Sequence, residues 1–276
     1  MPKEHERQAD QIEHLVAEVL ASSKYRDTSP ALVRTIASQE IVKRRGTKDI
    51  IKAIKNKLHQ VSGAYLPGNE DYQQWHTQLA EAASLNDSEH LKQTCRAIMN
   101  SHASTRERLP VLESFYSTLF AEVGPYQSIL DVACGLNPLC IPWLPRVPSV
   151  PLTYYACDIH ERLSDFLNNS FPLLGIQGTA WTQDVIQQPP EIEVDIAFIF
   201  KTLPCLEQVD KQASQRLLRA IRARHLFVSF PVASLGGRGK GMSANYEAHF
   251  QQLVADSPWR IQRYPFATEL VFHLTH

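Results

Sequence analysis

The chain has 276 residues, of which 43% are apolar and 21% are charged, and its formal net charge is −1. This composition can fill a hydrophobic core, which excludes a disordered tail or linker protein. No window approaches the roughly 18 consecutive apolar residues of a membrane-spanning helix, and the amino terminus is too charged for a signal peptide. We therefore expect a soluble, cytoplasmic protein that does not contact a membrane.

The five cysteines do not fit a metal or disulfide framework. Their number is odd and no pair has CxxC spacing, so we expect reduced, mostly buried thiols. His102 likewise has no neighbour at metal-ligand spacing, and we predict that the protein holds no metal.

The first 105 residues predict helices. Apolar residues recur at helical spacing from Ile12 to Leu20. Ser29-Pro30 starts a helix predicted over 31–45, which Gly46 ends. The polar stretch 68–95 predicts one or two surface helices. A capping box at 104–107 precedes a helix predicted over 109–120.

The helix predicted over 47–62 has two unlike faces. Apolar side chains share one side of it, namely Ile50, Ile54, Leu58 and Val61, and cationic or titratable ones share the other, namely Lys48, Lys52, Lys55 and His59. Residues 24–60 as a whole carry ten Lys and Arg against three Asp and Glu. A solvated surface is the simple explanation of such a block. A nucleic-acid-binding face is the functional one, and it makes these four residues candidate RNA contacts.

From residue 106 on, short β-rich runs alternate with helical ones. The predicted strands are Ser128–Val132, Thr153–Cys157, Ile176–Trp181, Asp195–Phe200, His225–Phe230, Trp259–Tyr264 and Glu269–Leu274. Alternation of this kind predicts an α/β fold with a doubly wound, mostly parallel seven-stranded sheet. The last two strands are too close in sequence for a crossover helix and should form an antiparallel hairpin. A doubly wound sheet that ends in such a hairpin resembles that of the S-adenosylmethionine-dependent methyltransferases. We therefore divide the chain into an all-α RNA-docking domain, 1–105, and a methyltransferase domain, 106–276.

Three residues at successive strand ends suit a nucleoside cofactor. Gly135 lets the backbone approach a ligand after the first strand. Asp158 ends the second strand and can accept hydrogen bonds from ribose hydroxyls, while Asp184 follows the third strand and can accept from an adenine amino group. No segment matches GxGxxG, which disfavours a dinucleotide cofactor. S-adenosylmethionine has no phosphate and fits this loop.

Two further segments are candidates for substrate contact. Lys201 ends the fourth strand, where it could touch cofactor or RNA. The glycine-rich stretch 234–242, which contains Arg238, Lys240 and Met242, could lie against a phosphate backbone. A buried-stem lysine and a plain flexible connector are the structural alternatives.

Several segments together resemble the Arm/Rmt family of aminoglycoside-resistance 16S rRNA methyltransferases. They are 131–139, 157–160, 183–185, 199–201, 228–231, 234–242 with 245–246, 58–59, 63–65 and 102–108. The resemblance implies methylation of N7 of one guanine in the decoding site of the assembled 30S subunit, with S-adenosylmethionine as donor. It also implies resistance to 4,6-disubstituted deoxystreptamine drugs such as gentamicin and kanamycin, and we expect a monomeric enzyme.

The same resemblance assigns roles to individual residues. It implies cofactor contacts at Tyr65, His102, Arg108, Ala133, Gly135, Asp158, Asp184, Val185, Phe200 and Gln208. Arg108 would hold the methionine carboxylate, and Arg238 and Met242 would position the target nucleotide. RNA contacts would come from Lys48, Lys52, Lys55, His59, Lys201 and Lys240.

Three alternatives stay open at this point. Adenine N1 of the same rRNA region is a second possible target, although guanine N7 carries a lone pair and needs no general base. A non-catalytic RNA-binding factor with this fold is another, against which Gly135, Asp158 and Asp184 argue. A small-molecule methyltransferase is the third, and the basic helical part argues against it.

Overall fold

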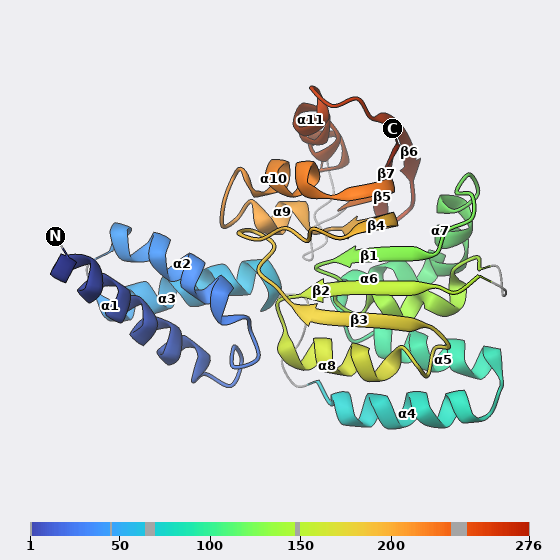
Figure 1. Ribbon diagram of the computed structural model, residues 1–276, viewed down its shortest axis with the longest axis horizontal. Helices are drawn as coiled ribbons and strands as arrows, with labels where there is room; N and C mark the ends of the chain where they lie inside the picture. Colours follow the sequence, from blue (N-terminus) through green and yellow to red (C-terminus); the bar gives the residue numbers. More distant parts are fainter. Residues whose placement is uncertain (1, 45, 64–69, 147–149, 233–241, 276) are drawn as a thin grey trace.

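The computed structural model describes residues 2–44, 46–63, 70–146, 150–232 and 242–275. Its centre is a seven-stranded sheet in the order β3-β2-β1-β4-β5-β7-β6 (Figure 1). The strands are β1 Ser128–Val132, β2 Thr153–Asp158, β3 Gln177–Thr182, β4 Glu193–Phe200, β5 Arg222–Pro231, β6 Arg260–Pro265 and β7 Glu269–Thr275. The first five are parallel, and β7 pairs antiparallel with both β5 and β6. The predicted sheet and its terminal hairpin are confirmed.

Helices cover both faces of the sheet. One face packs against α9 Leu203–Leu206, α10 Ala213–Ala220 and α11 Met242–Val254. The other packs against α4 Tyr72–Ser84, α5 Ser88–Met99, α7 Leu112–Leu119, α8 Glu161–Ser170 and the 3-10 helix η3 Asn137–Trp143. Strand residues alternate between these two cores, as the period of two requires: Leu130 belongs to one and Ile129 to the other.

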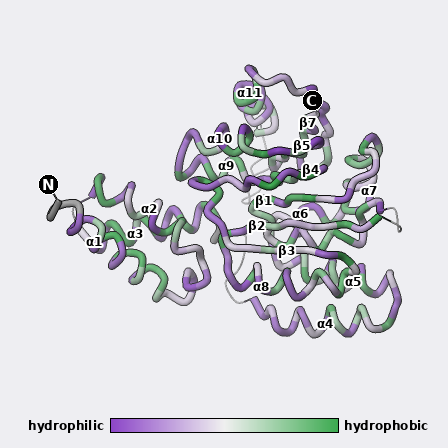
Figure 2. The backbone as a smooth tube through the Cα atoms, viewed as in Figure 1, coloured by the Kyte–Doolittle hydropathy of each residue, from purple (hydrophilic) through white to green (hydrophobic). Residues whose placement is uncertain are grey.

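Three helices at the amino terminus form a separate group at one end of the molecule (Figure 1). They are α1 Pro2–Leu20, α2 Pro30–Lys43 and α3 Thr47–Leu58, and a π-helical turn, η1 His59–Gly63, extends the last of them. On α3 the predicted apolar face is buried, with Ile50, Ile54 and Leu58 each at most 1% exposed. Figure 2 shows the matching alternation of hydrophobic and hydrophilic residues along the helices.

The stretch 68–95 does not join this amino-terminal group. Its helices α4 and α5 lie beside α8 and η3, on one face of the sheet. Leu79, Cys95 and Ile98 are buried there in the same core as Phe166. These two helices therefore pack with the elements that cover the sheet rather than with α1, α2 and α3. A domain boundary at residue 105 remains a proposal.

The helix expected over 109–120 starts earlier and is interrupted. Helix α6 covers Ala103–Arg108 with His102 at its N-cap, so the expected capping box lies inside it. A 3-10 turn, η2 Leu109–Val111, then leads to α7. Pro110 has no N–H to donate, which explains the break in the α-helical hydrogen bonding. Among the described residues, no helix is long and apolar enough to cross a membrane.

Candidate cofactor site

A pocket of about 890 Å³, including its part open to solvent, lies at the carboxyl ends of the parallel strands. The order of the sheet reverses between β1 and β4, and ligands of doubly wound folds bind at such a point. Its lining includes His102, Arg108, Ala133, Gly135, Asp158, Asp184, Val185 and Phe200. These eight predicted cofactor residues are thus brought together around one cavity of the size that takes small ligands.

The turn after β1 requires a residue without a side chain. Gly135 has a φ of +51°, and a Cβ built there would lie 2.8 Å from Nε2 of His102. Both the left-handed backbone and this close approach favour glycine. Ala133 also adopts a positive φ, of 51°, so the strand end is sharply turned toward the pocket.

Asp158 is held by the backbone around it. Its Oδ2 accepts from the Gly135 N–H at 2.9 Å, and its Oδ1 accepts from the N–H groups of Ile159 at 2.7 Å and His160 at 3.2 Å. A carboxylate has about four acceptor positions, so one remains, on Oδ2. The side chain is 8% exposed and lines the pocket. It is therefore a rigid acceptor with room for a donor from a ligand.

Asp184 is fixed from two directions. Its Oδ1 accepts from the Ile186 N–H at 3.0 Å, and its Oδ2 accepts from the hydroxyl of Thr35 on α2 at 2.9 Å. Burial raises the pKa of this carboxyl, while the two hydrogen bonds oppose the rise. The second bond joins the amino-terminal helices to the sheet, and nothing in the sequence indicates it.

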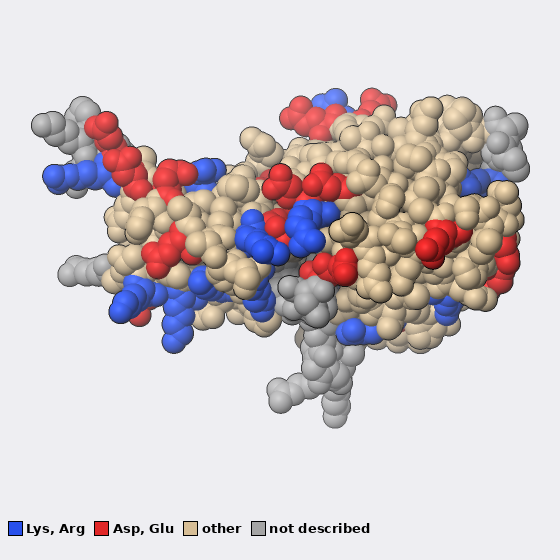
Figure 3. Space-filling model, turned by 90° about the horizontal axis from the view of Figure 1, so that it is seen from below, with Lys and Arg blue, Asp and Glu red and all other residues tan. Residues whose placement is uncertain are grey.

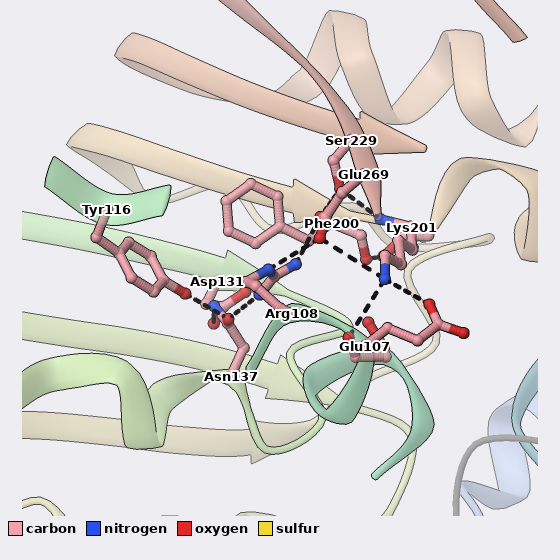
Figure 4. Close-up of polar contacts among 11 residues, drawn as sticks. Glu107, Arg108, Tyr116, Asp131, Asn137, Phe200, Lys201, Ser229 and Glu269 are labelled. Carbon is pink, nitrogen blue, oxygen red and sulfur yellow. Dashed lines mark hydrogen bonds and ion pairs between the residues drawn. The ribbon is translucent and has the colours of Figure 1, made fainter. Parts of the chain in front are cut away.

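Arg108 is fully buried and bound by three hydrogen bonds (Figure 4). Its Nε and Nη2 donate to the two carboxylate oxygens of Glu269 at 2.9 and 2.6 Å, and its Nη1 donates to Oδ1 of Asn137. The guanidinium carbon also lies 4.5 Å from the ring centroids of both Phe115 and Phe200. A guanidinium has five N–H groups, so two are left on its terminal nitrogens for an anionic ligand.

Charges around Arg108 compensate one another. Burial by itself would raise the pKa of Glu269, but the charges of Arg108 and Lys201 hold it below its usual value. Ser229 donates to the same carboxylate. A buried ion pair of this kind is costly to break because the remaining charge is left unpaired.

Lys201 requires a correction. The sequence predicts an RNA contact for it, but the side chain is only 4% exposed. Its Nζ donates to Glu107 Oε2 at 2.7 Å and to the Ser104 carbonyl at 3.3 Å, and it lies 3.6 Å from Glu269 (Figure 4). The lysine therefore belongs to the buried polar group that lines the pocket, where its charge is already compensated, rather than to an RNA-binding surface.

The titratable groups at the pocket are poorly suited to proton abstraction. Burial lowers the pKa of His102 to about 3, which leaves the imidazole neutral and weakly basic. Burial raises the pKa of Asp131 to about 7, but the side chain is only 1% exposed, and its Oδ2 already accepts hydrogen bonds from Asn137 and Tyr154 at 2.8 Å each, so its position rather than its pKa argues against a base. Asp131 thus serves hydrogen bonding inside the protein, and the ring of His102 packs close to Gly135. The site suits a reaction that needs no general base.

The cationic residues predicted on α3 lie at the surface. Lys48, Lys52 and His59 are exposed, and Lys55 is half-buried. His59 Nδ1 is 3.3 Å from Nζ of Lys24, a further cation of the basic block. Figure 3 shows Lys and Arg side chains projecting from the part formed by the amino-terminal helices.

The structure describes only some of the remaining predicted site residues. Tyr65, Arg238 and Lys240 lie outside the described residues. Met242 is half-buried at the start of α11. Gln208 is exposed, is not part of the pocket lining, and donates to the Pro204 carbonyl at 3.4 Å. The described part of the chain has no group of three His, Cys, Asp or Glu that could hold a metal ion.

Comparison with known proteins gives a consistent result. A family model described as "Ribosomal RNA methyltransferase (FmrO)" matches residues 21–273. The chain is 34% identical over 265 residues to a 16S rRNA (guanine(1405)-N(7))-methyltransferase of Micromonospora rosea, covering 95% of this chain and 96% of the relative. It is 36% identical over 240 residues to a protein of the same description from Serratia marcescens, covering 87% and 88% of the two chains.

Solved structures agree with the sequence relatives. The 16S rRNA methyltransferase RmtF, in complex with S-adenosyl-L-homocysteine, superimposes with a TM-score of 0.83 at 29% identity, covering 96% of this chain and 98% of that one. The 16S rRNA methylase RmtB gives a TM-score of 0.76 at 29% identity, with the same coverage. The chain therefore belongs to the FmrO family of ribosomal RNA methyltransferases, the family of aminoglycoside-resistance 16S rRNA methylases that its motifs resemble.

Proposed function

We propose that this enzyme uses S-adenosylmethionine to methylate N7 of a guanine in the decoding site of 16S rRNA, within the assembled 30S subunit. The product would give resistance to 4,6-disubstituted deoxystreptamine aminoglycosides such as gentamicin and kanamycin. The observation that carries the proposal is the pocket at the strand ends, where two buried carboxylates and the remaining N–H groups of a buried arginine converge. We expect a monomer that acts in the cytoplasm, where 30S subunits are.

The donor set of the pocket fits S-adenosylmethionine, whose sulfonium supplies the methyl group. Asp184 offers an acceptor for the adenine amino group, and Asp158 offers its remaining acceptor position for a ribose hydroxyl. Arg108 offers two N–H groups for the methionine carboxylate. Each polar end of the molecule thus has a partner of the required kind.

The protein's contribution to the chemical step is orientation. Guanine N7 has a lone pair and no proton to lose, which agrees with a pocket whose His102 is a weak base and whose Asp131 is buried and already accepts hydrogen bonds from Asn137 and Tyr154. Holding two reactants in line is worth up to roughly 7–11 kcal/mol. N7 lies in the deep groove of an RNA helix, so the base must leave its stack at a cost of a few kcal/mol.

Contacts to the phosphate backbone would offset that cost. Lys48, Lys52 and Lys55 on α3 present cations near the surface, together with His59. Arg238, Lys240 and Met242 are proposed to contact the target nucleotide and its neighbours. Binding of this kind weakens steeply as salt concentration rises, because each phosphate that a cation neutralises releases a counterion.

Methylation of purified 30S subunits tests the proposal. After reaction, N7 methylation gives a strand break only when the RNA is reduced and treated with aniline, whereas adenine N1 methylation stops reverse transcription directly. We expect the aniline-dependent break. A direct stop of reverse transcription would show that adenine N1, rather than guanine N7, is the target. If no methyl group is transferred, the protein would instead be a non-catalytic RNA-binding factor.

The cofactor assignment has its own test. Asp158→Ala should abolish calorimetric binding of S-adenosylmethionine, because Asp158 is the rigid acceptor at the end of β2. Asp165→Ala, at an exposed position of α8, should bind normally. Circular dichroism checks that both variants are folded. Unchanged affinity in folded Asp158→Ala would refute the ribose role.

Expression in a sensitive strain completes the test. We expect growth in gentamicin and kanamycin with retained sensitivity to apramycin. Resistance to apramycin would instead favour methylation at adenine.

A further inference from the structure

The connection between α1 and α2 pairs with the segment that directly follows Asp158. The Ser29 N–H donates to the Ile159 carbonyl at 2.6 Å, and the Glu161 N–H donates to the Asp27 carbonyl at 2.9 Å. Between them, Thr28 and His160 form an antiparallel β-bridge. Thr28 and Ser29 are 2% and 4% exposed. The amino-terminal helices are therefore hydrogen-bonded to the backbone that carries the acid at the end of β2.

The next turns of α2 reach the acid beyond β3. Leu32 lines the pocket, and the hydroxyl of Thr35 lies 2.9 Å from Oδ2 of Asp184, across 149 positions of sequence. From α3 and its extension, Val61 lines the same pocket. The wall of the pocket is thus built from both parts of the chain.

The Thr35 hydroxyl has one hydrogen and two acceptors within reach. One is the Ala31 carbonyl of its own helix at 3.0 Å, and the other is the Asp184 carboxylate. A charged acceptor makes the stronger bond. With Oδ1 held by the Ile186 N–H, the bond from Thr35 to Oδ2 fixes the plane of the carboxylate.

We propose that Thr35 is a positioning residue for Asp184, and that through this hydrogen bond the amino-terminal helices determine recognition of the adenine end of the cofactor. The inference rests on the proposed function, because it requires Asp184 to face the adenine amino group. Thr35 itself touches the acid rather than the cofactor. Through this contact, the preference of the pocket for an adenine base depends on the amino-terminal helices, which also include the basic helix α3.

Calorimetry with two ligands tests the proposal. S-adenosylhomocysteine carries the adenine amino group, and S-inosylhomocysteine has a carbonyl oxygen in its place. In Thr35→Val, which keeps the shape but removes the hydroxyl, the affinity for S-adenosylhomocysteine should fall roughly tenfold, the usual effect of losing a hydrogen bond to a charged group. The affinity for S-inosylhomocysteine should change little, so the ratio of the affinities for the adenosyl and inosyl ligands should decrease.

Two matched variants separate positioning from a merely structural effect. Thr35→Ser restores a hydroxyl and should recover wild-type affinity and preference. Thr77→Val, at an exposed position of α4, removes a hydroxyl that donates to the carbonyl four residues earlier in the same way, and should bind both ligands normally.

The possible outcomes distinguish the positioning role of Thr35 from the proposed methyltransferase function on which it rests. Equal weakening of both ligands in Thr35→Val, or no weakening at all, would overturn the positioning role while leaving the proposed enzyme intact. Failure of the wild-type protein to bind S-adenosylhomocysteine would overturn the proposed function itself.

Discussion

Two regions of the molecule contain the same contact, in which an arginine donates hydrogen bonds from Nε and Nη2 to the carboxylate of a glutamate. Between α1 and α2, Arg34 donates to Glu13 at 2.6 and 2.9 Å. Between α6 and β7, Arg108 donates to Glu269 at 2.9 and 2.6 Å. The side chains of the first pair are 46% and 57% exposed, and those of the second are 1% and 0% exposed.

The difference in burial decides what each contact does. Exposed pairs contribute little to stability because water and salt screen them. In a buried pair neither charge can be removed alone without leaving the other in a poorly polar environment. The amino-terminal helices therefore present charges that remain available for long-range attraction, whereas the buried group holds Arg108 in a fixed orientation beside the pocket.

The largest effect should come from breaking the buried pair. Glu269→Gln keeps the shape but leaves Arg108 without its counter-charge and Lys201 with one fewer, so we expect a loss of about 3–5 kcal/mol in the free energy of unfolding. Urea denaturation measures it, with Glu113→Gln on the exposed side of α7 as control.

The same substitution predicts a pH dependence. The folded pKa of Glu269 is depressed, so its contribution is present above its unfolded pKa, near 4.5, and is lost as pH falls through the folded value. The difference between wild type and Glu269→Gln should accordingly shrink in acid below about pH 4.5. A difference independent of pH would contradict the electrostatic account.

A second buried acid, Asp131, should show the opposite pH dependence: its contribution to stability should decrease as pH rises. The folded pKa of Asp131 is raised from 3.8 to about 7, so between these values the unfolded chain loses a proton that the folded chain keeps. The stability contribution of Asp131 should fall by up to about 1.4 kcal/mol per pH unit across that window. Asp131→Asn removes the titration, and its stability relative to wild type should rise from pH 4 to 7 in urea denaturation. Parallel pH profiles would exclude the raised pKa.

Substitutions of the surface cations on α3 should weaken RNA binding and leave the stability of the fold unchanged. Reversal of charge in Lys52→Glu/Lys55→Glu should weaken methylation of 30S subunits while sparing cofactor affinity and stability. The slope of log affinity against log salt should also become shallower, by roughly 0.7–0.9 for each phosphate that is no longer neutralised. Arg219→Glu, at an exposed position of α10, is the control. Full methylation by the double variant would remove α3 from RNA docking.

The smallest effect should come from the exposed counterpart of the buried pair. Glu13→Gln changes the same chemical contact as Glu269→Gln, yet we expect a melting temperature within error of wild type, because the pair is screened. A loss of stability comparable to that of Glu269→Gln would show that bidentate geometry, rather than burial, determines the value of these contacts.

The sequence predicts what depends on local pattern. Strand β1 falls at 128–132 as expected, because a buried run ends at a glycine that the turn requires. The acids at 158 and 184 reach one pocket, because the carboxyl ends of parallel strands meet at one edge.

Contacts between distant parts of the chain escape such reasoning. Thr35 meets Asp184 and Arg108 meets Glu269 across 149 and 161 positions, and no local pattern indicates either contact. The prediction that places Lys201 at the RNA is wrong for the same reason: its burial depends on Glu107 and Glu269, which only the fold brings to it.

The distribution of thiols has a practical consequence. All five cysteines lie among the described residues and none forms a disulfide. Burial raises the pKa of Cys95 and Cys140 to about 12 and holds the thiols of Cys134 and Cys157 protonated as well, which makes these four inert toward alkylating reagents. Cys205 alone is partly exposed, and it lines the pocket. A maleimide dye would thus label the native enzyme at one position, where its fluorescence could follow ligand entry without any engineered cysteine.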